Sequence, residues 1–147
     1  MEKFETQIKL ILVIFGEYFP LDELTELIKV TPTQSWTKGD KILLHQGLIR
    51  KNSKNRVRQE TVWEFSTGFI KTLDSEDVFL QFEKKFKNKL SVLSQYICKN
   101  KLKAVIDIVV EIADEEKPSV HFNKQIIKMC DKLGAEIDID LYQLRNY

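Results

Sequence analysis

The chain has 147 residues, with 23 lysines and arginines against 22 aspartates and glutamates, and its net charge is +1 at pH 7. This length is typical of one globular domain, so we expect a single domain over residues 1–147. The near-neutral charge argues against attraction of the whole surface to nucleic acid or to an anionic membrane. With 3 prolines and 5 glycines, collagenous and low-complexity structure is also excluded.

The N-terminal segment contains an apolar run from Ile8 to Phe15 that Lys9 interrupts. The run is too short to cross a bilayer and has no small-residue cleavage site, so it predicts a buried strand rather than a signal or anchor. Only Cys98 and Cys130 are present, which gives a disulfide framework little support. We therefore expect a cytoplasmic protein with no membrane partner, in which both cysteines are reduced core thiols.

The charges are segregated along the chain. Residues 38–58 contain one acidic residue, Asp40, and seven basic ones: Lys38, Lys41, Arg50, Lys51, Lys54, Arg56 and Arg58. Seven minus one gives +6 for this segment, which leaves −5 for the rest of the chain. The sequence therefore predicts a basic, mobile loop at 38–58 on an acidic body.

The first half of the chain is predicted to contain a strand, a short helix, a long loop with a short strand inside it, and a second strand, at residues 4–15, 19–30, 33–55, 43–49 and 58–69. Residues 4–15 alternate apolar and polar side chains at first and then turn apolar on both faces, which predicts a strand that becomes buried on both sides. Pro20 suits the first helical turn, and Pro32 ends the helix because the residue before a proline avoids helical backbone angles. Trp63 alternates with Val62 and Glu64 in the later strand.

The second half of the chain is predicted to contain a long helix, a strand, a short helix and a final strand, at residues 75–98, 104–112, 123–133 and 135–142. The long helix follows from an apolar stripe with helical spacing, formed by Phe79, Phe82, Phe86, Leu90, Leu93 and Ile97. Asn123 suits the cap of the short helix, and Gly134 suits its end. The final strand places Ile137, Ile139 and Leu141 on the face opposite its acidic residues, and we expect the helices to cover these three side chains.

These elements predict an α+β fold. We expect an antiparallel or mixed sheet of four to five strands, with one long and two short helices packed mainly on one face. A strand, a short helix that begins near a phenylalanine and an extended segment occur twice, before and after the long helix. The two β-α-β-like units make a split-ferredoxin-like arrangement the nearest common topology.

No residue pattern indicates catalysis. The only histidines, His45 and His121, lie in no local nucleophile-and-base pattern, and we interpret His121 as a structural residue at a helix entry. The two cysteines and two histidines lack the spacing of zinc ligands, and no glycine-rich phosphate loop is present. We therefore expect no catalytic residue, no metal and no cofactor, and a binding protein rather than an enzyme.

Five acidic residues are predicted to converge on one face of the sheet if the strands at 104–112 and 135–142 are neighbours: Asp107, Glu111, Glu136, Asp138 and Asp140. Three interpretations remain open. The carboxylates form a solvated outer face, bind Mg²⁺ or Ca²⁺ through oxygen ligands, or attract a basic partner.

The basic segment has two interpretations of its own. Its residues form a solvated or disordered loop, or they contact nucleic-acid phosphates while Trp36 and Trp63 stack on bases. The tryptophans are not interleaved within the charge run, so nucleic acid is the less favoured partner. A further alternative is a small-ligand or enzyme pocket around the Lys-Gly-Asp turn, formed by Trp36, Lys38, Asp40 and Trp63.

Three stretches together resemble the domain-of-unknown-function family numbered 4279 (DUF4279): FPLDELTELIKVTPTQSWTKGD, TVWEFSTG and LGAEIDIDLY. The likeness covers most of the chain. The residues that match the family pattern are Pro32, Trp36, Lys38, Gly39, Asp40, Trp63, Gly134 and Tyr142, and the basic stretch 41–58 departs from it. The resemblance implies no established activity, and it is compatible with a bacterial immunity protein that blocks a toxin.

The sequence thus leads to one main functional expectation. We expect a cytoplasmic bacterial interaction domain, of immunity type in its sharpest form, that binds a protein partner stoichiometrically. The acidic sheet face and the basic residues Arg50, Lys51, Arg56 and Arg58 would supply charge complementary to that partner.

Overall fold

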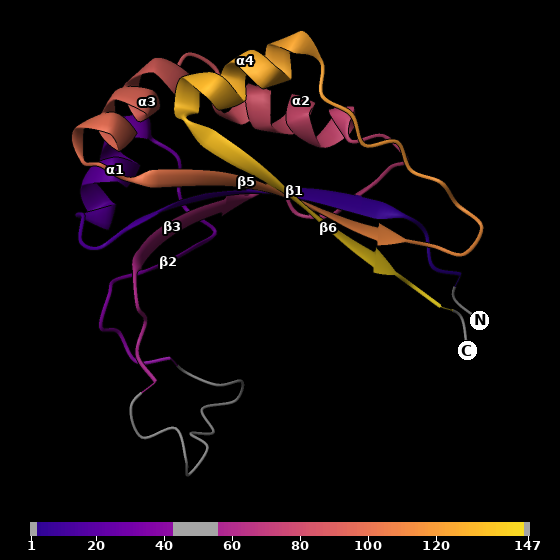
Figure 1. The fold of residues 1–147 in the computed structure, drawn as a ribbon, viewed down its shortest axis with the longest axis horizontal. Coiled ribbons are helices and arrows are strands. Elements are labelled where there is room, and N and C mark those ends of the chain that lie inside the picture. Colours follow the sequence, from indigo (N-terminus) through magenta and orange to yellow (C-terminus); the bar gives the residue numbers. More distant parts are fainter. Residues whose placement is uncertain (1–2, 43–55, 146–147) are drawn as a thin grey trace.

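The computed structural model describes residues 3–42 and 56–145. In this part of the chain one mixed sheet carries the helices on one of its faces (Figure 1). The strands are β1 (Gln7–Gly16), β2 (Gln34–Trp36), β3 (Thr61–Ser66), β4 (Ile70–Lys71), β5 (Lys103–Ile112) and β6 (Ala135–Gln143). The helices are α1 (Leu21–Ile28), α2 (Glu76–Lys85), α3 (Leu90–Lys99) and α4 (Lys124–Leu133). The predicted α+β class is confirmed.

The sheet order is β2-β3-β1-β5-β6, and the short β4 also pairs with β1. All neighbouring pairs are antiparallel except β5 and β6, which are parallel. Two crossovers interleave: β3 lies between the ends of β1–α1–β2, and β1 lies between the ends of the connection from β3 through α2 and α3 to β5. This is a split-ferredoxin-like arrangement, as predicted, but its second unit is β3–α2–α3–β5, whereas the sequence placed the second unit after the long helix. The unit β5–α4–β6 extends it by one parallel strand.

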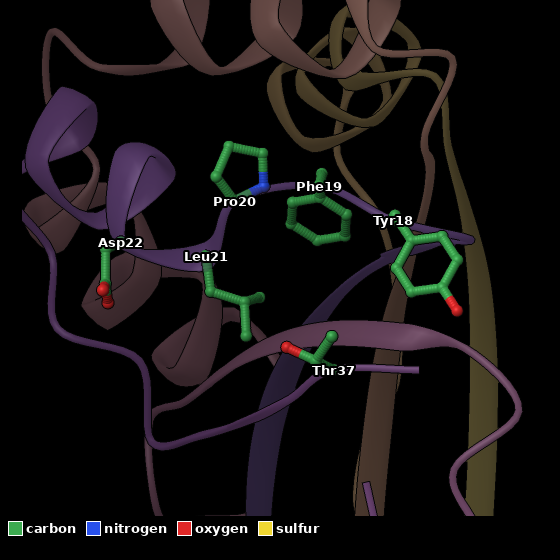
Figure 2. A pocket seen from close by; sticks show the side chains of 6 residues that line it. All are labelled: Tyr18, Phe19, Pro20, Leu21, Asp22 and Thr37. Carbon is green, nitrogen blue, oxygen red and sulfur yellow. The ribbon is translucent and has the colours of Figure 1, made fainter. Parts of the chain in front are cut away.

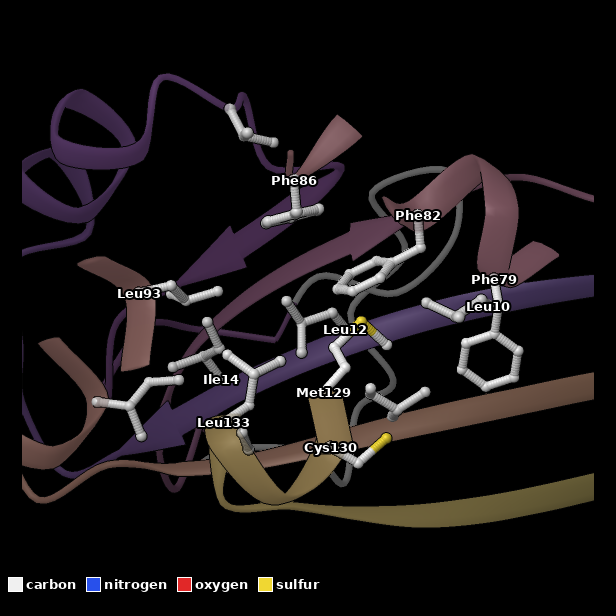
Figure 3. Close-up of a cluster of buried hydrophobic side chains, with 14 of the residues drawn as sticks. Leu10, Leu12, Ile14, Phe79, Phe82, Phe86, Leu93, Met129, Cys130 and Leu133 are labelled. Carbon is white, nitrogen blue, oxygen red and sulfur yellow. The ribbon is translucent and has the colours of Figure 1, made fainter. Parts of the chain in front are cut away.

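The hydrophobic core lies between the sheet and the helices. β1 runs through the middle of the sheet, and its even-numbered side chains from Ile8 to Ile14 are fully buried. Figure 3 shows Leu10, Leu12 and Ile14 of β1 facing aromatic side chains of α2 and the sulfur-containing side chains of α4. Phe82 stacks on Phe86 with ring centroids 4.5 Å apart. The predicted apolar stripe thus anchors the core, with only Leu90 half-buried among its six residues.

The predicted long helix over 75–98 is wrong in one respect, because it is two helices. α2 ends at Lys85 and α3 starts at Leu90, and Asn88 between them adopts a left-handed backbone with a φ of 64°. A left-handed residue cannot continue a right-handed helix, so the chain changes direction there. The break lets α3 pack against α1 and α4 while Phe82 and Phe86 stay on the sheet.

Both the start and the end of the last helix, α4, are as the sequence predicts. The Asn123 side chain accepts a hydrogen bond from the Ile126 N–H at 2.9 Å, and Gly134 adopts a left-handed backbone with a φ of 62°. Cys130 of this helix is buried, and burial raises the pKa of its thiol. Cys98 is exposed, so the expectation of two core thiols holds only for Cys130.

The far half of β6 departs from expectation. Ile137 is half-buried beneath the helices, but Ile139 is 44% exposed and Leu141 is 62% exposed. Figure 1 shows the reason, because β6 runs on beyond the end of α4 and leaves the helical layer. The expectation that all three aliphatic side chains are packed under helices is therefore wrong for Ile139 and Leu141.

The segment between β2 and β3 contains a strand that the sequence did not predict. β2 pairs with β3 in the part expected to be loop, whereas the short strand expected at 43–49 lies outside the described residues. The base of the basic loop is paired, because the Ile42 N–H donates to the Arg56 carbonyl and the Arg58 N–H donates to the Asp40 carbonyl. Within the described residues no helix is long and apolar enough to cross a membrane.

Candidate functional site

The described helices lie on one face of the sheet, and we call the opposite face, which they leave uncovered, the open face (Figure 1). Register partners in a sheet share a face. Because the even-numbered residues of β1 are buried under the helices, its odd-numbered residues lie on the open face. Ile11 pairs with Asp107, which pairs in turn with Asp138, so acidic residues of β5 and β6 lie there too.

The centre of the open face is apolar. It consists of side chains from four neighbouring strands: Ile11, Val13, Phe15, Trp36, Val62, Val105 and Val109. Val62 and Val109 are buried by their neighbours alone, and the others are half-buried. A sheet face in contact with water normally carries polar residues in alternation. This apolar centre is therefore unusual for a surface that no helix covers.

The β5–β6 side of the open face is acidic, as the sequence predicts. Its five carboxylates are Asp107, Glu111, Glu136, Asp138 and Asp140, because Val105 pairs with Glu136, Val109 with Asp140 and Glu111 with Tyr142. The Gln7 side-chain amide donates a hydrogen bond to Glu111 from β1. The pattern of alternation and the parallel pairing together bring these residues to one place.

Asp107 is the most perturbed of these acids. Burial, a hydrogen bond to Asp140 and the charges of Asp140 and Asp138 raise the pKa of Asp107 to about 6, and Lys9 offsets part of the effect. Its Oδ1 atom is buried and has no hydrogen-bond partner among the described residues. The charged form of Asp107 is therefore less favourable than that of a free aspartate.

On the opposite side of the open face, the basic residue Arg58 lies shortly before β3 and contacts Trp36 of β2. The Arg58 guanidinium lies over the Trp36 ring, 3.9 Å from its centroid. Burial raises the pKa of Glu64 beside them, although Arg58 and Lys9 lower it in part. Arg56 is exposed at the base of the loop, whereas Arg50 and Lys51 lie outside the described residues.

The basic and acidic sides do not meet. Trp36 lies on β2 and the acidic side begins on β5, so three strand spacings, or roughly 14 Å, separate them. A partner that used both sides would need a contact of at least that width.

Three residues of the family pattern, Lys38, Gly39 and Asp40, stabilise the turn that they form. Asp40 accepts a hydrogen bond from the Thr37 N–H at 2.8 Å, and Gly39 has a φ of 92°, which favours glycine. Lys38 donates its N–H to the Thr61 side chain, so the Lys-Gly-Asp turn is fastened to the start of β3. Pro32 is half-buried before β2. Tyr142, on the open face, is exposed.

Trp63 belongs to the core and not to a binding surface. It is fully buried, and its Nε1 donates to the Thr25 hydroxyl of α1 at 3.1 Å. It therefore cannot line the pocket that the sequence suggested around Trp36, Lys38, Asp40 and Trp63. The same burial keeps it from stacking on a nucleic-acid base.

A surface pocket of about 500 Å³ does lie beside the Lys-Gly-Asp turn (Figure 2). It lies between the β1–α1 connection and Thr37, and its lining residues are Tyr18, Phe19, Pro20, Leu21, Asp22 and Thr37. Lys38 reaches its margin, because the Lys38 ammonium lies 5.5 Å from the centroid of the Tyr18 ring and 3.5 Å from the Glu17 carboxylate. The pocket thus has the aromatic rings of Tyr18 and Phe19 in its lining and lies close to the Lys38 cation.

A second polar cluster joins Asp74, Glu76 and His121, which sequence reasoning missed. His121 Nε2 lies 3.0 Å from Glu76 Oε1, and His121 Nδ1 lies 3.8 Å from Asp74 Oδ1. One ligand atom from each residue falls within 4.8 Å of the others, so the three offer a mixed nitrogen and oxygen donor set for a divalent metal. These donors already bond within the protein, because Asp74 accepts the Glu76 N–H and Glu76 accepts from the Asn123 amide.

The cluster holds the start of α2 against the loop before α4. The Ser75 hydroxyl is fully buried and exchanges hydrogen bonds with the His121 backbone. The only sequence signal was the Asp-Ser-Glu pattern at the start of a helix, which does not point to a histidine far along the chain.

Comparison with known proteins identifies the family of the chain. No curated protein and no solved structure matches it. The family described as "Domain of unknown function (DUF4279)" matches residues 6–144, which is nearly the whole chain, and it contains the stretches from which the resemblance was inferred. The chain therefore belongs to the DUF4279 family.

Proposed function

We propose that this domain binds a protein partner stoichiometrically through the open face of its sheet. One observation carries the proposal: uncovered apolar side chains, Val13 and Val105 among them, lie directly beside five carboxylates. An exposed apolar area rimmed by polar residues is typical of protein–protein contact. A sheet face that only contacts water would be expected to carry polar side chains at its centre.

The charges on this face indicate the chemistry of the partner. The acidic residues are crowded enough that the pKa of Asp107 is raised to about 6, chiefly by burial and then by Asp140. A lysine or arginine brought next to Asp107 and Asp138 would favour the charged form of Asp107 and gain a charge-assisted hydrogen bond. We therefore propose a partner whose contact surface is basic at the β5–β6 side and apolar in the middle.

An immunity-type role is the finer form of this proposal. A domain that covers the basic surface of a toxin blocks it by occupying that surface in a one-to-one complex, and the domain needs no catalytic residue to do so. Electrostatic complementarity of this kind speeds association and selects the partner. A toxin with a basic active surface is the partner that this chemistry fits.

The test is capture of the partner from the cells that naturally make the protein, followed by charge reversal. We expect a one-to-one complex by sedimentation, and we expect the double variant Asp138→Lys, Asp140→Lys to lose it. The matched control is Glu26→Lys, Asp131→Lys, which makes the same change of charge on exposed residues of α1 and α4. The proposal fails if no protein is captured, or if both double variants retain the complex equally.

A second candidate function is small-ligand binding in the pocket beside Thr37. The observation that favours it is the aromatic lining from Tyr18 and Phe19 with the Lys38 cation at the margin. Such a site would suit a flat aromatic molecule whose carboxylate replaces Glu17 as the partner of Lys38. A screen of aromatic carboxylates with wild-type protein and with Lys38→Ala would test it, because binding that survives the substitution leaves the cation without a role.

A further inference from the structure

β6 is the last strand of the sheet in the described residues, with β5 on one side and a free edge on the other. It is exposed along most of its length, and from Asp138 onward both of its faces are open to solvent. Tyr142, for example, is 55% exposed on the open face and Leu141 is 62% exposed on the helical side. A long exposed edge of this kind is a template for another strand.

The groups that β6 offers at this edge follow from its pairing with β5. The Leu144 N–H donates to the Ile112 carbonyl at 2.8 Å, which shows that even-numbered residues of β6 direct their backbone groups toward β5. Backbone directions alternate along a strand, so the N–H and C=O groups of Ile137, Ile139 and Leu141 point to the free edge. These three residues supply the hydrogen bonds that an added strand would use.

A second copy of this chain does not suit the edge. If two copies joined their β6 strands into one sheet with all helices on the same side, residues of the same face would lie opposite each other. Glu136, Asp138 and Asp140 would then face the same three carboxylates of the other copy. Like charges directly opposite across a strand pair are destabilising. The charges therefore select a strand of different chemistry.

We infer that β6 accepts an extended segment of the partner as an added strand, in which lysine or arginine alternates with valine, isoleucine or leucine; this rests on the function proposed above. The basic side chains would lie on the open face beside Asp138 and Asp140. The apolar ones would lie on the helical side and cover Ile139 and Leu141. Main-chain bonds hold such an added strand, and alternate side chains make it specific.

The probe is a synthetic eight-residue peptide of alternating lysine and valine, with a block peptide of the same composition as its control. We expect the alternating peptide to bind at least tenfold more tightly, and to slow hydrogen exchange at the amides of Ile137, Ile139 and Leu141. Equal binding of the two peptides would mean that charge alone attracts them, and would overturn the inference.

Two further measurements separate edge pairing from attraction to the face. Two peptides are compared, one N-methylated at its odd-numbered residues and one at its even-numbered residues, so that each lacks the backbone donors along one edge only. We expect one of these peptides to lose binding and the other to keep it. In the protein, Ile139→Pro removes the one N–H of residue 139 that points to the free edge of β6. An edge strand tolerates a proline at such a position, because no bond within the sheet is lost. We expect it to weaken peptide binding at least tenfold, while Ile139→Val does not.

The partner complex distinguishes this inference from the proposed function. If Ile139→Pro retains the captured partner while Asp138→Lys, Asp140→Lys loses it, the open face binds and strand addition is wrong. If neither variant affects the complex, both proposals are wrong. If both variants lose it while circular dichroism shows each to be folded, both are supported.

Discussion

Asp107 of β5 and Asp138 of β6 are register partners in a parallel strand pair, so two carboxylates lie side by side on the same face of the sheet. Burial, the hydrogen bond to Asp140 and the charges of Asp140 and Asp138 raise the pKa of Asp107 to about 6. In an unfolded chain an aspartate titrates near pH 4. The folded protein therefore holds this proton more tightly than the unfolded chain does.

The first prediction is a pH-dependent stability that depends on Asp107. The stabilising effect of the bound proton is complete below about pH 4 and is lost as the pH rises through about 6. Asp107→Asn stays uncharged at every pH. We expect it to raise the free energy of unfolding at pH 8 by about 1 kcal/mol, after allowance for solvent screening, and to change it little near pH 4.5.

Urea unfolding at the two pH values measures this difference. Glu136→Gln is the control, because it removes a charge from the same face at a position that pairs with Val105 instead of an acid. A loss of stability at pH 8 in Asp107→Asn would contradict the assignment of a raised pKa.

The second prediction concerns the aromatic stack under the helices. Phe82 is fully buried and stacks on Phe86, whereas Leu80 on the same helix is 52% exposed. Phe82→Ala should lower the free energy of unfolding by about 3–5 kcal/mol, since it leaves a cavity in a packed core. Leu80→Ala should cost less than about 1 kcal/mol. Chemical denaturation followed by circular dichroism gives both values, and similar losses would contradict the packing described.

The third prediction uses two helix ends with the same backbone conformation and different residues. Lys29 ends α1 with a φ of 53°, and Gly134 ends α4 with a φ of 62°. A side chain disfavours this left-handed conformation by about 1 kcal/mol or more. Lys29→Gly should therefore raise the melting temperature, and Gly134→Ala should lower it.

The Gly134 substitution isolates the backbone effect, because an added Cβ at Gly134 would meet no atom within 4 Å. Thermal unfolding of the two variants and the double variant measures both effects. Shifts of the same sign in the two single variants would rule out this explanation.

The fourth prediction concerns the buried indole of Trp63. Its Nε1 donates to the Thr25 hydroxyl, which in turn donates to the Leu21 carbonyl. Thr25→Val leaves the indole N–H without its acceptor inside the core, and we expect a loss of about 1–3 kcal/mol in the free energy of unfolding. Thr25→Ser keeps the hydroxyl and should lose less. If the serine variant is the less stable of the two, the methyl group and not the hydrogen bond matters there.

Sequence reasoning recovered most of the fold because its long strands and helices have clear periods. β6 alternates throughout, β1 and β5 carry an apolar residue at every second position of one face, and α4 carries both an asparagine cap and a terminal glycine. The break at Asn88 was missed because Phe86 and Leu90 keep their helical spacing across it. β2 was missed because its three residues give no alternation to detect.

The candidate site was predicted in part for a related reason. The five carboxylates share a face because strand periodicity fixes their side, and this could be inferred once β5 and β6 were assumed to be neighbours. Alternation cannot say which face of a strand is covered, so Trp63 was assigned to a pocket although it is core. His121 and Asp74 come together through the bridge between Asp74 and Ser119, a contact between distant segments that no local pattern encodes.

The central position of β1 has a consequence for how the protein is made. Ile8 must pair with Val110 of β5 before the middle of the sheet can close, and the partners of β1 on its other side lie in β3 and β4. Such distant pairing is associated with slow folding and with transient intermediates that aggregate. During synthesis the most apolar strand therefore leaves the ribosome long before its neighbours, and we expect newly made chains to depend on chaperones until β5 has emerged.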